Sequence, residues 1–317
     1  MLTEKHKHTF MTSLTQTIKS TTKSLSSPES VKGLLHQKLD HVPLPSNGAL
    51  EEIIQLAREI LLPGYFGQCK VGQDTLDFYI GVSLERLYSL LKKQIVAGLC
   101  FDLRKEDGEV DITPIRQKAI LITTLLIERL PRIREMLATD IEAAYKGDPA
   151  ATSFGEIIAC YPVIRTLCNY RFAHELHELG VPLIPRMISE LGHSETGIDI
   201  HPAAQIGSHF TIDHGTGVVI GSTCIIGNRV KLYQGVTLGA LSFPLDKDGN
   251  PIKGIARHPI IGDDVIIYSN ASILGRITIG DRSVIGANKW ITENVAPDSK
   301  IYTNFRGHRG FEDGTGI

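Results

Sequence analysis

Apolar side chains recur at every sixth position over much of the second half of the chain, in two runs separated by an irregular segment. Neither a helix, with a period of 3.6 residues, nor a flat amphipathic strand, with a period of 2, produces such a repeat. Something must therefore turn the chain at fixed intervals and bring the apolar position inward each time. The positions are Ile200, Ile206, Ile212, Val218, Cys224, Val230 and Val236, then Ile261, Ile267, Ile273, Ile279, Ile285 and Ile291.

This period predicts a triangular parallel β-helix. Each six-residue unit is one short strand and a corner, and three units close a coil of about 18 residues that stacks on the next at roughly 4.8 Å. A β-sandwich rich in Ile and Val is the alternative, but a sandwich does not hold one fixed period over so many positions. Glycines directly after a repeat residue suit tight corners, as at Gly207, Gly262, Gly280 and Gly286.

The two runs share one register only if residues 242–260 leave the coil as a loop, with Leu241 and Ile261 at its edges. Loops that protrude from repeat arrays often carry binding residues. This loop approaches its end with Arg257 and His258, so we expect a cation and an imidazole at the rim of the coil.

Upstream, between about residues 51 and 190, the apolar period is that of helices. Prolines are expected to divide this region into short helices, at Pro63, Pro131, Pro162, Pro182 and Pro185. The fold class is therefore α+β, an all-helical domain followed by a β-helix with a protruding loop. We expect a tail and lead-in over 1–48, a helical domain over 49–195, the β-helix over 196–300 and a C-terminal tail over 301–317.

Composition narrows the class of protein. The 317 residues suffice for two domains, and 33 basic against 35 acidic residues give a charge of −2, which favours neither nucleic acid nor a membrane surface as partner. Five scattered cysteines without CxxC spacing, and no long apolar run, indicate a cytoplasmic protein with reduced thiols. Residues 5–28 weakly resemble a transit peptide but contain no arginine, so we expect a disordered or frayed tail.

Candidate chemistry lies where the first coil turns. Asp199 is followed by Asp213 and His214, and on a coil of about 18 residues a separation of about 15 returns the chain almost to the same edge. Asp199 can then reach His214, and a carboxylate that holds an imidazole in one tautomer makes it a better general base. The alternative is that both are ordinary solvent-facing residues of the coil.

The chain resembles the serine O-acetyltransferases, in the branch with a longer N-terminus. The motifs are DIHPAA at 199–204, DHGTG at 213–217, a loop ending in RHP at 257–259, and DPA at 148–150 in the helical region. The resemblance spans roughly residues 135 to 300. It implies a left-handed β-helix, a homotrimer or dimer of trimers, no metal, and acetyl transfer from acetyl-CoA to the hydroxyl of L-serine, with L-cysteine as feedback inhibitor.

The resemblance also implies roles for individual residues. His214 resembles the general base and Asp199 its orienting partner. The residues that resemble the binding set for the serine ammonium and carboxylate are Asp148, Asp213, Arg257 and His258. Taken alone, Asp148 followed by proline is also a good helix start, and Arg257 would be a surface charge.

Acetyl-CoA should lie along a groove between neighbouring coils of the trimer, near Gly239, Ala240, Ser269 and Ala287. The sequence departs from the family's commoner form at two of these places. Tyr-Ser-Asn stands at 268–270 where glycine-alanine-glycine is frequent, and Ala-Leu-Ser at 240–242 where glycine-threonine-glycine is frequent.

Two other activities fit parts of the pattern. A transferase acting on a sugar or antibiotic hydroxyl would keep His214 without needing Asp148 and Asp213. A metal-dependent hydratase of the carbonic anhydrase type would use His209 and His214 on a β-helix trimer. Its third histidine would come from His174, His177, His193 or His201.

The chain ends in a glycine-rich segment, 306–317, that has no repeat to hold it and is expected to be mobile. In the resembled family a tail ending in isoleucine can dock into O-acetylserine sulfhydrylase, which would make Ile317 a contact residue. The alternative is a terminus without a partner.

Overall fold

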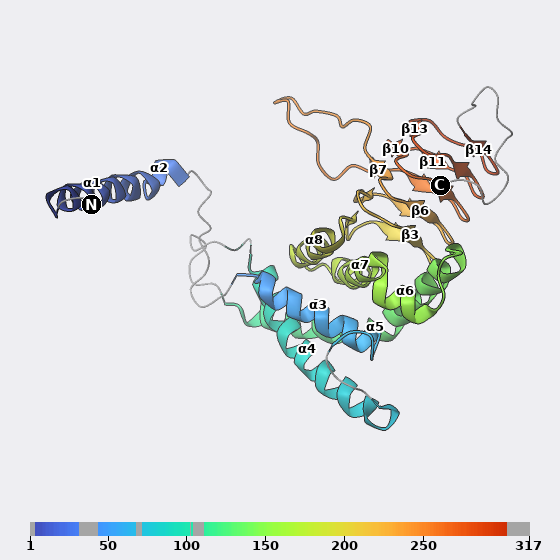
Figure 1. Cartoon of the computed structure of the whole chain (residues 1–317), viewed down its shortest axis with the longest axis horizontal. Helices are drawn as coiled ribbons and strands as arrows, with labels where there is room; N and C mark the ends of the chain where they lie inside the picture. Colours follow the sequence, from blue (N-terminus) through green and yellow to red (C-terminus); the bar gives the residue numbers. More distant parts are fainter. Residues whose placement is uncertain (1–3, 32–43, 68–71, 102, 104–110, 303–317) are drawn as a thin grey trace. The chain divides into compact units, whose positions relative to one another are not determined.

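The computed structural model describes residues 4–31, 44–67, 72–101, 103 and 111–302 (Figure 1). The chain divides into two units, one of residues 1–43 with 102–110 and one of residues 44–101 with 111–317. The first contains α1 (Glu4–Leu25) and α2 (Pro28–Val31). The disorder expected over 5–28 is therefore wrong for most of that segment, which has no glycine or proline before Pro28 to interrupt a helix. The tail at Ile317 lies outside the described residues.

The second unit begins with helices. They are α3 (Asn47–Leu61), the 3₁₀ turn η1 (Gln73–Thr75), α4 (Leu76–Leu99), α5 (Thr113–Gly147), α6 (Phe154–Cys160), α7 (Pro162–Glu178) and α8 (Ile184–Thr196). Serine side chains cap two of them, Ser46 at α3 and Ser153 at α6. Their buried apolar side chains form one hydrophobic cluster with those of the β-helix. Among the described residues, no helix is both long and apolar enough to cross a membrane.

One predicted helix break does not occur. Pro131 lies inside α5, which runs unbroken from Thr113 to Gly147. A proline there removes one backbone donor and costs about 3 kcal/mol in an isolated helix. The neighbouring side chains Leu130 and Ile133 are buried in the core, so tertiary packing outweighs the local cost.

The rest of the second unit is a parallel β-solenoid of about five turns, consistent with the left-handed β-helix of hexapeptide repeats expected from the sequence. Three sheets form its sides, in the orders β1-β4-β7-β10-β13, β11-β8-β5-β2 and β14-β12-β9-β6-β3. The strands are β1 (Asp199–Ile200), β2 (Gln205–Ile206), β3 (Thr211–Asp213), β4 (Val219–Ile220), β5 (Ile225–Ile226), β6 (Lys231–Tyr233), β7 (Thr237–Gly239), β8 (Ile260–Ile261), β9 (Ile266–Ile267), β10 (Ser272–Leu274), β11 (Thr278–Ile279), β12 (Val284–Ile285), β13 (Trp290–Ile291) and β14 (Lys300–Ile301).

The first coil is longer than the repeat predicts. Asp199 pairs with Val219, twenty positions later, whereas Val219 pairs with Thr237, eighteen positions later. The inward residues that continue from Ile200, Ile206 and Ile212 are therefore Ile220, Ile226, Leu232 and Leu238, and not the predicted Val218, Cys224, Val230 and Val236. Both sets are buried, so the period alone could not separate them.

The second predicted run is confirmed, because Ile261, Ile267 and Ile273 pair in register with Ile279, Ile285 and Ile291. The loop leaves after β7 and returns at β8, and residues 240–256 extend away from the coils in Figure 1. Ile260, predicted to belong to the loop, is a strand residue.

Side chains of the helices cap the open end of the solenoid. Figure 1 shows α7 beside β3 in the first coil. The Tyr170 hydroxyl donates to the carbonyl of Ala204 at 2.6 Å, and the Arg171 guanidinium donates to the carbonyls of Ile206 and Gly207 at 2.6 and 2.7 Å. The carboxylate of Asp140, fully buried in α5, pairs with Arg171. Backbone groups that a sixth coil would have bonded are thus satisfied by the helices.

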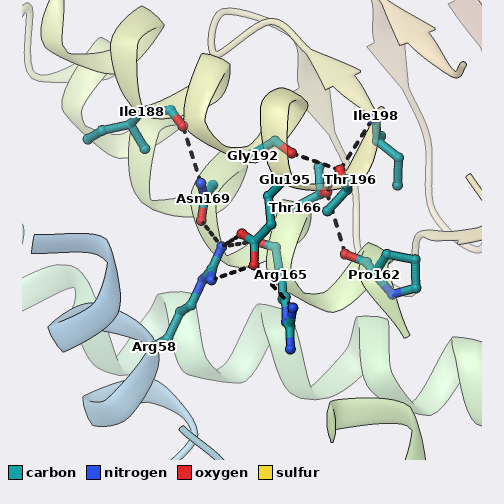
Figure 2. A network of polar contacts seen from close by, with 10 residues as sticks. All are labelled: Arg58, Pro162, Arg165, Thr166, Asn169, Ile188, Gly192, Glu195, Thr196 and Ile198. Carbon is teal, nitrogen blue, oxygen red and sulfur yellow. Dashed lines mark hydrogen bonds and ion pairs between the residues drawn. The ribbon is translucent and has the colours of Figure 1, made fainter. Parts of the chain in front are cut away.

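A buried arginine joins α3 to the end of α8 (Figure 2). The Arg58 guanidinium donates to the two carboxylate oxygens of Glu195 at 2.6 and 3.3 Å. The next residue, Thr196, shares a 2.7 Å hydrogen bond with the hydroxyl of Thr166 and accepts the backbone N–H of Ile198 at 3.2 Å. These bonds fix the short segment that connects α8 to β1.

Candidate active site

Asp148 lies at the C-terminal end of α5, as its cap residue. Its Oδ1 accepts the N–H of Ala150 at 2.8 Å, and its Oδ2 accepts the hydroxyl of Tyr161. The tyrosine bond, helped by the backbone bond, holds the pKa of Asp148 below its usual range, and the same bond raises the pKa of Tyr161 to about 12. No helix starts at Asp148, because the next helix, α6, is capped by Ser153. The carboxylate is therefore ionised and oriented.

His214 lies at the corner that carries the two extra residues of the first coil. Five residues, 214–218, join β3 to β4, whereas three, 234–236, join β6 to β7. His214 has a left-handed backbone, with φ of 56°, and its imidazole is 68% exposed, with Nε2 3.8 Å from Oδ1 of Asp213. The corner thus presents the imidazole to solvent beside a carboxylate.

The joint between helices and strands supports this corner. Gly215, directly after His214, has φ of 91°, and a Cβ built there would lie 2.4 Å from Cδ1 of Ile198. Gly217 donates its N–H to the carbonyl of Gly197 at 2.8 Å. Position 215 therefore requires glycine, because any side chain there would collide with Ile198 and would strain the left-handed backbone. The corner that carries His214 therefore packs against residues 197–198, which the hydrogen bond from Ile198 to Thr196 holds in place.

Three side chains that the sequence did not single out complete the cluster: Tyr161, Lys231 and Tyr233. Lys231 projects from β6, where its Nζ donates to the carbonyl of Gly147 at 2.7 Å and lies 3.2 Å from Oδ2 of Asp213. The same Nζ lies 4.5 Å from the centre of the Tyr233 ring. The structure thus brings a lysine between the end of α5 and the first coil.

The strand register predicted from the sequence does not place Lys231 at the site. In the structure Lys231 pairs with Thr211, because the first coil has twenty residues. A coil of eighteen would have set Arg229 opposite Thr211 instead. Arg229 lies at another corner, where it forms an ion pair with Asp264. The signal that could have found Lys231 is the second buried apolar set, which begins at Ile220.

Asp199 lies at the start of β1, in the sheet that follows the His214 corner. Its Oδ1 is 3.5 Å from Nη1 of Arg186, and it groups with Glu190 and His193, each offering a ligand atom within 4.8 Å of the others. Among the contacts of the described residues, none joins Asp199 to His214. An orienting role for Asp199 stays a prediction.

Arg257 and His258 lie at the other edge of the same sheet. Their backbone N–H groups donate to Oγ1 of Thr223, just beyond the end of β4, at 2.9 and 3.1 Å. The His258 ring is buried, its Nδ1 accepts the N–H of Thr223 at 3.1 Å, and burial followed by the charges of Arg257 and Arg276 lowers its pKa. His258 is therefore a neutral anchor that returns the loop to the coil, and within one chain Arg257 is separated from His214 by the width of the sheet.

The four residues expected near the coenzyme fall on the same two edges. Ser269 and Ala287 stack on successive coils at the edge of His214, where Asn288 donates its N–H to the carbonyl of Ser269 at 2.9 Å. Gly239 and Ala240 lie at the edge of Arg257, where β7 ends. All four side chains are small and none is fully buried, which leaves open surface at both edges.

The hydratase alternative requires His209 and His214 to bind one metal. His209 lies at the opposite end of β3, with Nδ1 3.1 Å from Oγ of Ser208 and Nε2 3.5 Å from the carboxylate of Glu142. The three-residue group around Asp199, which is the cluster with ligand spacing in the described part of the chain, contains neither histidine. The described residues therefore give this ligand set no support.

His201 predicts a pH dependence of stability. Burial and the nearby Arg186 charge lower its pKa from 6.5 to about 4, and its Nδ1 accepts the N–H of Ala203 at 3.1 Å, a bond that protonation would break. Because the pKa is lower in the folded protein, the contribution is present above pH 6.5 and is lost as the pH falls to about 4. We expect the urea midpoint of the wild type to fall more steeply over this interval than that of His201→Gln. Parallel curves would contradict the prediction.

Comparison with known proteins decides the family. Residues 258–293 match the family described as bacterial transferase hexapeptide (six repeats). A plasmid-encoded serine acetyltransferase of Synechococcus elongatus is 48% identical over 277 residues, which cover 87% of this chain and 86% of the relative. The chain belongs to the serine acetyltransferase family.

Solved structures of the family agree. Serine acetyltransferase 1 of Entamoeba histolytica, in complex with L-cysteine, is 38% identical with a TM-score of 0.68, and the match covers 80% of this chain and 86% of that one. The enzyme of Neisseria gonorrhoeae, in complex with serine, is 27% identical with a TM-score of 0.52, over 80% of this chain and 95% of that one. Members of the family thus bind the two amino acids that the sequence reasoning named.

Proposed function

We propose that this chain transfers the acetyl group of acetyl-CoA to the hydroxyl of L-serine, giving O-acetyl-L-serine and free coenzyme A. The observation that carries the proposal is the meeting of Asp148 and Asp213 with His214 in a chain 48% identical to a serine acetyltransferase. Two carboxylates suit a substrate ammonium, and an imidazole suits a hydroxyl proton. A sugar or antibiotic hydroxyl would leave the carboxylates without a partner.

The reaction needs no covalent enzyme intermediate. The serine oxygen attacks the thioester carbonyl while His214 accepts its proton, so that a carbon–oxygen bond forms and the carbon–sulfur bond then breaks. The imidazolium returns the proton to the departing thiolate. Asp148 and Asp213 hold the ammonium, and Arg257 the carboxylate, so that the hydroxyl is delivered to the base.

The distance between His214 and Arg257 within one chain supports a trimer. A side of six residues spans about 20 Å at ~3.3 Å per residue, longer than a serine molecule, so His214 and Arg257 of one chain cannot hold the same substrate. Rotational symmetry brings one edge of a subunit against the opposite edge of its neighbour and completes the site. The protruding loop offers apolar contacts for such packing, with exposed Leu241, Phe243, Leu245, Ile252 and Ile255. Acetyl-CoA would lie in the same groove, against Gly239, Ala240, Ser269 and Ala287.

Regulation follows from substrate shape. L-Cysteine carries the ammonium and carboxylate of serine with a thiol in place of the hydroxyl, so it should compete for the same site. The L-cysteine complex of the Entamoeba relative supports this feedback. We also propose a cytoplasmic enzyme, and contact with O-acetylserine sulfhydrylase through Ile317.

Thiol release from acetyl-CoA tests the function. The purified chain should release thiol with L-serine and not with sugars, aminoglycosides or L-threonine. L-Cysteine, whose own thiol requires that loss of the thioester absorbance be followed instead, should raise the KM for L-serine without changing kcat. Equal rates with sugar acceptors, or no release with L-serine, would overturn the proposal. A single trimer and a dimer of trimers are distinguished by light scattering of the same sample.

A further inference from the structure

Lys231 holds a largely buried position that the proposed reaction does not use. Its side chain is only 15% exposed, and its Nζ meets the carbonyl of Gly147 at 2.7 Å and the carboxylate of Asp213 at 3.2 Å. Burial opposes its charge, but the bonds to Tyr233 and Asp213 outweigh burial and raise the pKa of Lys231. A lysine buried at this depth is held by specific partners and is not a solvated surface charge.

These partners belong to two different parts of the fold. Gly147 is the last residue of α5 and directly precedes Asp148, whereas Asp213 is the last residue of β3 in the first coil. The carbonyls at the end of a helix lack intrahelical donors and carry its negative dipole end, so an ammonium group binds there favourably. By bonding the Gly147 carbonyl, Lys231 fixes the backbone that carries Asp148.

The net charge of the cluster also suits a ligand with one ammonium group. Asp148 and Asp213 carry two negative charges, and Lys231 carries one positive charge between the segments that bear them. One negative charge remains, which a single substrate ammonium neutralises. Without the lysine, the two carboxylates would repel each other across a partly buried site.

We propose that Lys231 is the positioning residue that sets the separation of Asp148 and Asp213, and thereby tunes the amino-acid site for a ligand with one ammonium group. This proposal rests on the proposed function, because it takes the two carboxylates as the ammonium site. Lys231 acts through the carboxylates and does not itself touch the substrate.

Lys231→Met tests the proposal, since methionine keeps much of the side-chain volume and removes the charge and the donors. We expect the KM for L-serine and the inhibition constant of L-cysteine to rise together by about tenfold, as for a lost charge-assisted bond. The kcat and the KM for acetyl-CoA should stay within about twofold, because neither the base nor the coenzyme groove is changed. Lys300→Met is the matched control, since Lys300 lies on the same sheet in β14 and carries the same substitution.

A double-mutant cycle separates positioning from general stabilisation. If Lys231 acts through the two carboxylates, Lys231→Met should raise the KM of Asp213→Asn by a smaller factor than it raises that of the wild type, whereas independent effects would multiply. Lys231→Gln provides a second variant if the methionine form does not fold, and because its amide carries no charge, its KM for L-serine should rise as well.

The outcomes distinguish the two proposals. Wild-type enzyme that releases no thiol with L-serine would overturn the proposed function. An active wild type with an unchanged KM for L-serine in the folded Lys231 variant would overturn the positioning role alone. Multiplicative effects in the cycle, or an equal rise in Lys300→Met, would overturn it as well.

Discussion

His214→Asn is expected to lower the kcat of acetyl transfer by about 10²–10⁴-fold, the usual worth of a general base. Asparagine removes the base but tolerates the left-handed backbone, with φ of 56°, that position 214 requires. The loss should therefore come from the chemistry and not from a strained corner. Thiol release at saturating L-serine measures kcat, and thermal unfolding verifies that the variant is folded.

His209→Asn is the matched control. His209 occupies the corner at the other end of β3 with φ of 57°, and its ring contacts Ser208 and Glu142. It carries no part of the proposed reaction, so its kcat should stay close to that of the wild type. A His214→Asn enzyme that keeps most of its turnover would remove the base assignment.

Mixing two impaired variants is expected to restore activity. His214→Asn lacks the base, and Arg257→Ala lacks the carboxylate clamp at the opposite edge of the sheet. If neighbouring subunits share each site, a mixed trimer contains one intact pair among its three sites, so trimers that carry both tags should retain roughly a third of the wild-type sites. Co-expression with two affinity tags, followed by tandem purification and assay at low L-serine, measures this recovery.

The control for mixing is the double variant, His214→Asn with Arg257→Ala in one chain, co-expressed with the wild type. Both variants of the first experiment leave the coil intact, since neither side chain is buried in it. If the mixed trimers are no more active than the two parent variants, His214 and Arg257 of the same subunit form one site. The proposal of a site shared between neighbouring subunits would then be wrong.

The sequence predicts the solenoid well because its signal is repeated on every coil. Ile261, Ile267 and Ile273 pair as expected, since each coil packs mainly on its neighbours and local apolar positions decide the pairing. The helical region was harder to predict, because Pro131 lies within α5 between the buried side chains of Leu130 and Ile133, and tertiary packing of this kind is not visible in a local pattern.

The site was predicted in part for a related reason. Motifs identified Asp148, Asp213 and His214, and the structure brings the three into one cluster through Lys231. The position of Lys231 depends on the two extra residues of the first coil, which move the register to the second apolar set that begins at Ile220. The sequence contains both sets, and the period alone does not select between them. The contacts of Asp199 with Arg186 depend on where α8 ends, which the sequence leaves undetermined within a few residues.

Tyr170, Arg171 and Asp140 cap the first coil, so the two ends of the solenoid are not equivalent. A stack of identical coils has no intrinsic end, and an uncovered strand edge is a template on which another chain can add. Trimming the chain to its repeats would leave the carbonyls of Ala204 and Ile206 without donors and open that template. The helices therefore prevent the addition of strands at the first coil and set the end from which the coils are counted.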